Sequence, residues 1–275
     1  MMRVAYKDCY RAGVYMDWFY TVSGFAVGFI VGVTGVGGGS LMTPLLVLVF
    51  GIAPATAVGT DLLYAALTKM GGSWVHGRRG TVDWKVVKLL VLGSLPASAL
   101  SMALLHYLTL DENYLKAVVT SMLSVALLLT AIALILQPWL QKLGQRGDRK
   151  SIGLDPRYLP LATIVSGFVL GVLVTISSVG AGALGVVLLL FLYPRMQATK
   201  IVGTDIAHAV PLTLFAGLGY AAMGLVDYGL LGSLLIGSLP GVWLGSHLGV
   251  KIPDRILRPI LATMLMLIST KLMLQ

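Results

Sequence analysis

Ser23-Gly-Phe-Ala-Val-Gly28 opens a stretch of the chain that recurs 143 residues later as Ser166-Gly-Phe-Val-Leu-Gly171. The likeness continues through the glycine-rich steps that follow, which are Thr34-Gly-Val-Gly-Gly-Gly39 and Ser177-Ser-Val-Gly-Ala-Gly182. A repeat of this length is the mark of an internal duplication. It predicts two similar halves that pack around a shared central site.

The duplication extends over most of the chain. Three more motifs recur at an offset of 144, and one inserted residue before the second copy accounts for the change from 143. The pairs are Val58-Gly-Thr-Asp61 with Val202-Gly-Thr-Asp205, Gly80-Thr-Val-Asp-Trp84 with Gly224-Leu-Val-Asp-Tyr228, and Gly93-Ser-Leu-Pro96 with Gly237-Ser-Leu-Pro240.

The composition is that of an integral membrane protein. Hydrophobic residues make up 57% and charged residues 11% of the 275, and the mean hydropathy is +0.89. A soluble globular domain carries about a quarter charged residues. The apolar stretches are long and show none of the period-2 alternation of an outer-membrane barrel, so we expect an all-α polytopic fold. Residues 1–17 lack the pattern of a cleavable signal peptide, and the single Cys9 excludes an internal disulfide.

Each half contains five apolar segments. The second segment of each half is too short to span a membrane and directly follows the glycine-rich step, which predicts a broken or re-entrant helix. The expected organisation is an N-terminal transmembrane repeat over 1–136, a cytoplasmic linker over 137–158 and a C-terminal repeat over 159–275. The predicted segments are 19–34, 41–50, 57–75, 86–108 and 115–136 in the first half, and 159–177, 184–192, 201–223, 228–248 and 256–274 in the second.

The basic residues predict that the halves are inverted relative to each other. Arg78 and Arg79 follow the third segment of the first half, whereas the matching stretch 223–228 has no basic residue. Because basic loops stay in the cytoplasm, the linker is expected inside and the N-terminus outside, although Arg3 and its basic neighbours then break the rule. The net charge of +9 fits a cytoplasmic face beside anionic lipid and requires no nucleic-acid partner.

The glycine-rich steps predict an anion site. Adjacent glycines weaken a helix and free backbone N–H groups, so the ends of two half-helices would present positive dipole ends to a ligand. A dinucleotide fingerprint would need a strand before it and is disfavoured. Close helix packing is the alternative for the outer glycines at four-residue spacing, such as Gly24 and Gly28. The candidate substrate-binding residues are Thr34, Gly35, Gly37, Gly38, Gly39, Ser40, Thr60, Ser177, Ser178, Gly180, Gly182 and Thr204.

Asp61 and Asp205 are the candidate proton-coupling groups. A carboxylate at membrane depth is costly unless it is paired, hydrated or used, and burial there favours the neutral carboxyl that a proton carrier needs. Helix capping is the alternative role. His208 lies three residues after Asp205 and could form a relay with it or a structural hydrogen bond. Lys69 could attract an anion or extend to the cytoplasmic surface.

Other repeated residues fit structural roles. Pro96 and Pro240 occupy equivalent places inside apolar segments and predict paired kinks or hinges. Asp83 and Asp227 each precede an aromatic residue, which is typical of a helix cap with an interfacial anchor. No Ser-His-Asp spacing, metal cluster or Walker-type loop stands out in the sequence. We therefore expect no cofactor or metal, and neither an enzyme nor an ATP-driven pump.

These motifs, in this order and duplicated, resemble the TauE/SafE family of sulfite exporters and 4-toluene sulfonate uptake permeases. The resemblance runs from about Ser23 to Leu272 and includes His76-Gly-Arg-Arg-Gly-Thr-Val-Asp-Trp84. It implies a multi-pass bacterial inner-membrane protein that transports small sulfur-containing anions such as sulfite, sulfonates or sulfoacetate. It further implies proton coupling and export, with the anion, protons and membrane lipids as the partners.

The expected mechanism is alternating access, in which protonation of Asp61 or Asp205 biases which side is open. Two other classes remain open. A passive anion channel would share the fold but would not accumulate its substrate, and a membrane-embedded enzyme would need a nucleophile or metal and would form product without a gradient.

Overall fold

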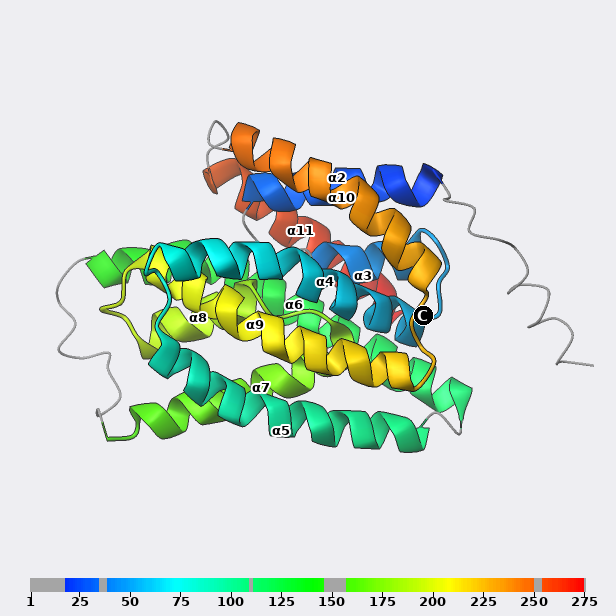
Figure 1. Ribbon diagram of the computed structural model, residues 1–275, viewed down its shortest axis with the longest axis horizontal. Helices are drawn as coiled ribbons and strands as arrows, with labels where there is room; N and C mark the ends of the chain where they lie inside the picture. Colours follow the sequence, from blue (N-terminus) through cyan, green and yellow to red (C-terminus); the bar gives the residue numbers. More distant parts are fainter. Residues whose placement is uncertain (1–17, 35–38, 109–110, 146–156, 250–253, 275) are drawn as a thin grey trace, which may run out of the picture.

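The computed structural model describes residues 18–34, 39–108, 111–145, 157–249 and 254–274, and these residues form an all-helical bundle (Figure 1). The predicted all-α fold is confirmed. The second apolar segment of each half forms a helix of ten residues, as expected from its length. The helices are α2 (Trp18–Thr34), α3 (Gly39–Leu48), α4 (Pro54–Arg78), α5 (Trp84–Leu108), α6 (Glu112–Gln145), α7 (Leu159–Ser177), α8 (Ala183–Leu192), α9 (Ala198–Ala222), α10 (Tyr228–Gly249) and α11 (Asp254–Met273).

Within the described ranges, five helices are long and apolar enough to cross a membrane, namely α5, α6, α7, α9 and α10. Large apolar side chains such as Leu100, Trp243 and Leu267 are exposed on the outside of the bundle. Such an exposed apolar surface is suited to lipid. The structure is therefore that of a polytopic membrane protein.

The two halves exchange helices. The first helix of each half packs along the fourth helix of the other half, so that α2 lies on α10 and α7 lies on α5. Figure 1 shows α2 and α10 along one side of the bundle, α5 and α7 along the opposite side, and α4 and α9 between them. The equivalent helices α4 and α9 pack on each other, as do α6 and α11. The most extensive helix–helix contacts therefore join the two halves.

Glycines make the exchanged pairs close. A Cβ atom on Gly24 would lie 2.7 Å from the carbonyl oxygen of Leu234, and one on Gly28 would collide with the backbone of Ser238. In the other pair, Gly167 and Gly171 meet the backbones of Leu90 and Ser94 in the same way. The packing role considered for these outer glycines is therefore what the structure shows.

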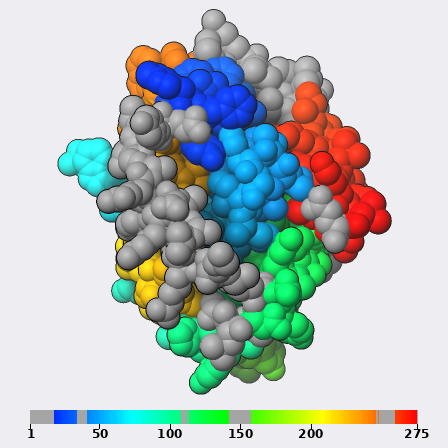
Figure 2. Space-filling view, turned by 90° about the vertical axis from the view of Figure 1, so that its right-hand side faces the viewer, coloured from blue at the N-terminus to red at the C-terminus, as the bar shows by residue number. Residues whose placement is uncertain are grey.

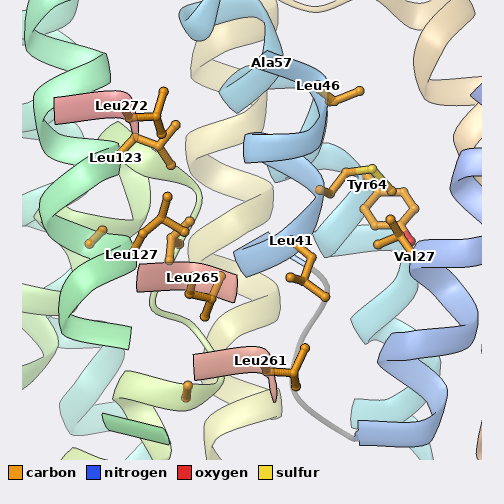
Figure 3. Close-up of a cluster of buried hydrophobic side chains, with 14 of the residues drawn as sticks. Val27, Leu41, Leu46, Ala57, Tyr64, Leu123, Leu127, Leu261, Leu265 and Leu272 are labelled. Atoms are coloured by element: carbon orange, nitrogen blue, oxygen red, sulfur yellow. The ribbon is translucent and has the colours of Figure 1, made fainter. Parts of the chain in front are cut away.

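The short helices lie inside the bundle. Leu41 and Leu46 of α3 pack in a buried cluster that also contains Leu123 of α6 and Leu265 of α11 (Figure 3). The end of α3 and the following loop reach the surface, where light-blue residues lie between α2 and α11 in Figure 2. A broken helix is tolerated at membrane depth when protein surrounds it.

α6 differs from the prediction in length. It continues to Gln145 and passes through Pro138, so that the first part of the segment expected as a linker is helical. The start of α6 is fixed by Asp111, whose side chain accepts a hydrogen bond from the N–H of Asn113 at 3.0 Å. The division at 137–158 and the orientation of the halves across the membrane stay predictions.

Candidate functional site

The Gly-Thr part of each Val-Gly-Thr-Asp motif joins the two halves. A Cβ atom on Gly203 would collide with the carbonyl oxygen of Thr81, and the neighbouring Thr204 hydroxyl accepts a hydrogen bond from the N–H of Asp83 at 2.9 Å. Asp83 lies directly before α5, so α9 of one half supports the start of a helix of the other. The absence of a side chain at Gly203 permits this approach.

The second copy of the motif repeats the arrangement. A Cβ atom on Gly59 would collide with the carbonyl oxygen of Leu225, and the Thr60 hydroxyl accepts a hydrogen bond from the N–H of Asp227 at 3.1 Å. The candidate substrate residues Thr60 and Thr204 are thus both engaged in contacts between the halves. Since the Gly-Thr step faces the partner half, the following aspartate points into the bundle.

Asp61 is completely buried on α4. Its Oδ2 atom accepts a hydrogen bond from the hydroxyl of Thr43 on α3. Its Oδ1 atom has no hydrogen-bond partner among the described residues. The hydroxyl of Ser178 lies close by, in the segment between α7 and α8.

Asp205 is 1% exposed on α9. Its Oδ1 atom, too, has no hydrogen-bond partner in the described part of the chain. The carboxylate lies directly against Gly185 of α8, where any Cβ atom would collide with it. The capping role considered for Asp61 and Asp205 is wrong, because the N-cap residues of α4 and α9 are Ala53 and Gln197.

The two carboxylates lie toward opposite ends of the helix pair formed by α4 and α9. α4 and α9 run antiparallel, since Gly59 faces Tyr220 at one end of the pair and Gly203 faces His76 at the other. Asp61 therefore lies near one end and Asp205 near the other, about four helical turns apart. Lys69 lies between them and within electrostatic range of both.

The ammonium group of Lys69 is directed into the bundle. Its Nζ atom donates a hydrogen bond to the carbonyl oxygen of Ala181 at 2.8 Å, and the residue is half-buried. Ala181 belongs to the break between α7 and α8. This hydrogen bond directs Lys69 inward and argues against extension to the surface, whereas its anion-attracting role stays a prediction.

His208 is buried and interacts with the other half. Its Nε2 atom lies 2.9 Å from the hydroxyl of Ser94, while its Nδ1 atom has no partner among the described residues. The residue equivalent to His208 is Tyr64, which lies beside Ser238, the equivalent of Ser94. The repeated Gly-Ser-Leu-Pro motif thus directs a serine toward α4 or α9 of the opposite half. Asp205 and His208 are not joined by a hydrogen bond.

The break between α7 and α8 is a buried turn with an uncapped helix start. Ser178, Gly180 and Gly182 have positive φ angles of 59°, 122° and 134°. α8 has Gly182 as its N-cap and no side-chain cap hydrogen bond. The Ser178 hydroxyl is buried without a partner among the described residues, whereas the Ser177 hydroxyl donates to the carbonyl oxygen of Leu173 at 2.6 Å.

The matching break in the first half is not fully described. Gly35, Gly37 and Gly38 lie outside the described residues. Thr34 is the last residue of α2, and Gly39 and Ser40 are the first residues of α3. The side chains of Thr34 and Ser40 lie outside the described part of the structure. The structure therefore places Ser178, Gly180 and Gly182 near Lys69 and Asp61, and leaves the first-half set as a prediction.

The buried polar cluster consists of Asp61, Asp205, Lys69, His208 and Ser178. Two residues that contact it, Ser94 beside His208 and Thr43 beside Asp61, had no role assigned from sequence. Ser94 could have been found from the Gly-Ser-Leu-Pro motif, since the serine stands in both halves. Thr43 could not have been found in this way, because the equivalent residue in the second half is Val186 and the threonine is not repeated.

A surface groove of about 460 Å³ lies at the end of α4, apart from this cluster. Arg78 packs over the ring of Trp74 there, 4.0 Å from its centroid, and Trp84 lines the same groove. Tryptophan beside arginine is typical of a membrane interface. In the described part of the chain, no group of His, Cys, Asp and Glu side chains is placed to hold a metal ion.

Comparison with known proteins gives one consistent result. The chain is 40% identical over 254 residues to Probable membrane transporter protein YjnA of Bacillus subtilis strain 168, covering 90% of this chain and 96% of that protein. It is 28% identical to Probable membrane transporter protein YdhB of the same organism, over 85% of this chain and 91% of that protein. It is 27% identical to Probable membrane transporter protein MJ0441 of Methanocaldococcus jannaschii, over 86% of this chain and 85% of that protein.

No solved structure matches the chain. The sequence profile of the family described as Sulfite exporter TauE/SafE matches residues 20–272, which is nearly the whole chain. A bacterial inner membrane as the location fits the bacterial relatives. The chain belongs to the TauE/SafE family of membrane transporters.

Proposed function

We propose that this protein is a secondary active transporter of small sulfur-containing anions, coupled to protons and working by alternating access. The observation that carries the proposal is the pair of buried carboxylates, Asp61 and Asp205, each with an oxygen atom that has no partner among the described residues. The sulfur chemistry comes from the family description, Sulfite exporter TauE/SafE.

The break between α7 and α8 supplies the donors for an anion. The first backbone N–H groups of a helix carry partial positive charge, and no side chain caps those of α8. The buried hydroxyl of Ser178, which lies beside Asp61, is in the same turn. A sulfonate or sulfite group presents several acceptor oxygens and suits such a set of donors.

The carboxylates supply the proton coupling. An ionised carboxylate buried with an unpaired oxygen is costly, and protonation or a counter-ion removes that cost. Asp61 and Asp205 occupy equivalent places in the two halves, about four turns apart along α4 and α9. Protonation from one side would stabilise closure on that side and favour opening of the other.

The test is transport by the purified protein in proteoliposomes. Radiolabelled sulfoacetate and sulfite uptake is measured with and without an imposed pH gradient, for the wild type, Asp61→Asn with Asp205→Asn, and the control Asp111→Asn. Asp111 is exposed at the start of α6, so its change removes a carboxylate outside the cluster.

We expect the wild type and Asp111→Asn to accumulate anion above equilibrium when a pH gradient is imposed, and the double variant to lose that accumulation. Flux that never exceeds equilibration in the wild type would indicate a channel. Unchanged pH-driven accumulation in the double variant would refute the coupling role. Conversion of the anion in detergent, without any gradient, would indicate an enzyme.

A further inference from the structure

We propose that Lys69 is the charge partner of the transported anion, and that anion and protons therefore cross the membrane together in the same direction. The inference rests on the proposed function and adds a binding residue and the sign of the coupling to it.

Lys69 is placed to receive a ligand. Its Nζ atom is anchored 2.8 Å from the carbonyl oxygen of Ala181, beside the uncapped start of α8 and in the same turn as the unpartnered Ser178 hydroxyl. An ammonium group has three N–H donors, and this anchor uses one of them. The others are available to an anion held between the ammonium group and the N–H groups of α8.

One cation serves both carboxylates. The repeat equivalent of Lys69 is Thr213, whose hydroxyl donates to the carbonyl oxygen of Ala209 within α9 at 2.8 Å. Lys69 itself lies within electrostatic range of Asp61 on its own helix and of Asp205 and His208 on α9. The duplication has thus left two carboxylates and a single lysine, which makes one shared anion site rather than two.

The other polar groups beside Asp61, Asp205 and His208 do not alter this charge balance. Thr43 of α3, Ser94 of α5 and Ser178 between α7 and α8 are neutral, and Tyr64 on α4 is a phenol. His208, whose Nε2 atom lies 2.9 Å from the Ser94 hydroxyl, is buried without a carboxylate hydrogen-bonded to it, so its neutral imidazole is favoured and adds no charge. Asp61, Asp205 and Lys69 are therefore the groups whose charges decide whether an anion is attracted or repelled.

With both carboxylates ionised, the cluster has one negative charge in excess and repels an anion. With both protonated, Lys69 is left with a positive charge that a monoanion can neutralise. Anion binding and proton binding must then favour each other, by the reciprocity of linked equilibria. An inward proton gradient consequently drives uptake, and export requires an outward gradient of the anion itself.

The sign is measured with sulfoacetate and methanesulfonate as probe anions, because sulfite itself takes up and releases protons near neutral pH and would mask those of the protein. Purified protein in weakly buffered detergent is mixed with each anion while a pH dye reports proton uptake. Proteoliposomes with an internal pH dye are then given an inward gradient of the anion that binds. Sulfoacetate and methanesulfonate keep an ionised sulfonate, so neither enters a liposome as a neutral acid.

Co-transport predicts alkalinisation of the detergent solution on binding and acidification of the liposome interior on anion entry. Proton release on binding, or an interior that becomes alkaline during transport, would overturn the inference while leaving the proposed function in place. If no probe anion binds or is transported by the wild type, the proposed function fails and this inference with it.

Three variants test whether Lys69 supplies the positive charge that binds the anion. Lys69→Gln is expected to weaken anion binding about 10- to 100-fold, because a charge-assisted hydrogen bond is lost. It is also expected to reduce the linked proton uptake, because buried carboxylates without a neighbouring cation favour the protonated form before the anion binds. Lys69→Arg is expected to retain both. Lys88→Gln removes an exposed lysine of α5 and is expected to change neither. Lys69→Gln protein that elutes as a folded species and binds the anion as tightly as the wild type would refute the role of Lys69.

Discussion

The hydroxyl of Thr204 accepts a hydrogen bond from the backbone N–H of Asp83 at 2.9 Å, and this contact fixes the start of α5 against α9. Its counterpart joins Thr60 to Asp227. The two contacts sit at opposite ends of the antiparallel pair α4 and α9. A threonine of each half therefore binds the backbone at the start of a helix in the other half.

Replacing Thr204 by valine is expected to lower the free energy of unfolding by about 1 kcal/mol, because it leaves the N–H of Asp83 without its acceptor. Thr204→Ser keeps the hydroxyl and should retain most of the stability. Thermal unfolding in detergent, followed by circular dichroism, compares the two. Equal melting temperatures for the valine and serine variants would show that the hydrogen bond contributes nothing.

Replacing Gly203 by alanine is expected to destabilise the protein. In Gly203→Ala the new Cβ would collide with the carbonyl oxygen of Thr81, at a cost of about 1–3 kcal/mol. Gly71, on α4, has no described atom within 4 Å of the place that a Cβ would occupy, so Gly71→Ala should be neutral or stabilise by up to about 1 kcal/mol. The melting temperature should fall for Gly203→Ala and should stay the same or rise for Gly71→Ala. A loss of stability at Gly71 as large as that at Gly203 would contradict the packing argument.

Asp83 is expected to make stability depend on acid pH. Burial opposes its ionisation, but the hydrogen bonds from Lys200 and from the N–H groups of Val86 and Lys85 outweigh burial and hold the pKa of Asp83 below its usual 3.8. The stabilisation is therefore fully present above about pH 4 and is lost as the pH falls through the lower folded-state value.

The ion pair behind this effect joins Lys200 Nζ to Asp83 Oδ2 at 3.1 Å and is partly exposed, so water screening limits its contribution to less than about 1 kcal/mol. Melting temperatures are measured from about pH 6 to about pH 3, the range in which carboxyl groups titrate. As the pH is lowered, the melting temperature should fall less steeply for Asp83→Asn than for the wild type. Identical slopes would show that Asp83 does not contribute to the acid dependence.

Gly185 is expected to control the position of the Asp205 carboxylate. A Cβ atom in Gly185→Ala would occupy the space of Oδ1, so the carboxylate must move. We expect pH-driven anion accumulation to fall about tenfold, since small displacements of a functional group are costly. Gly232→Ala on α10, where no described atom lies within 4 Å, is the matched control. Accumulation that is unchanged in Gly185→Ala would show that the position of Asp205 does not matter.

Much of the fold could be predicted from the sequence because apolar length and repetition are local properties. The ten-residue helices α3 and α8 follow from short apolar runs after glycine-rich steps, and the membrane class follows from composition alone. Asp61 and Asp205 stand out as carboxylates in apolar segments. The extension of α6 to Gln145 could not be anticipated, because polar residues continue a helix as readily as they end it.

The sequence by itself determined that this chain has two homologous, membrane-embedded helical halves with one carboxylate at an equivalent place in each. Only the tertiary structure decided that the halves exchange helices, that Thr60 and Thr204 serve the contacts between them, and that Lys69 reaches the break between α7 and α8. The physical reason is that spacing along a helix specifies which face a residue occupies, whereas its partner across the bundle depends on which helix packs there.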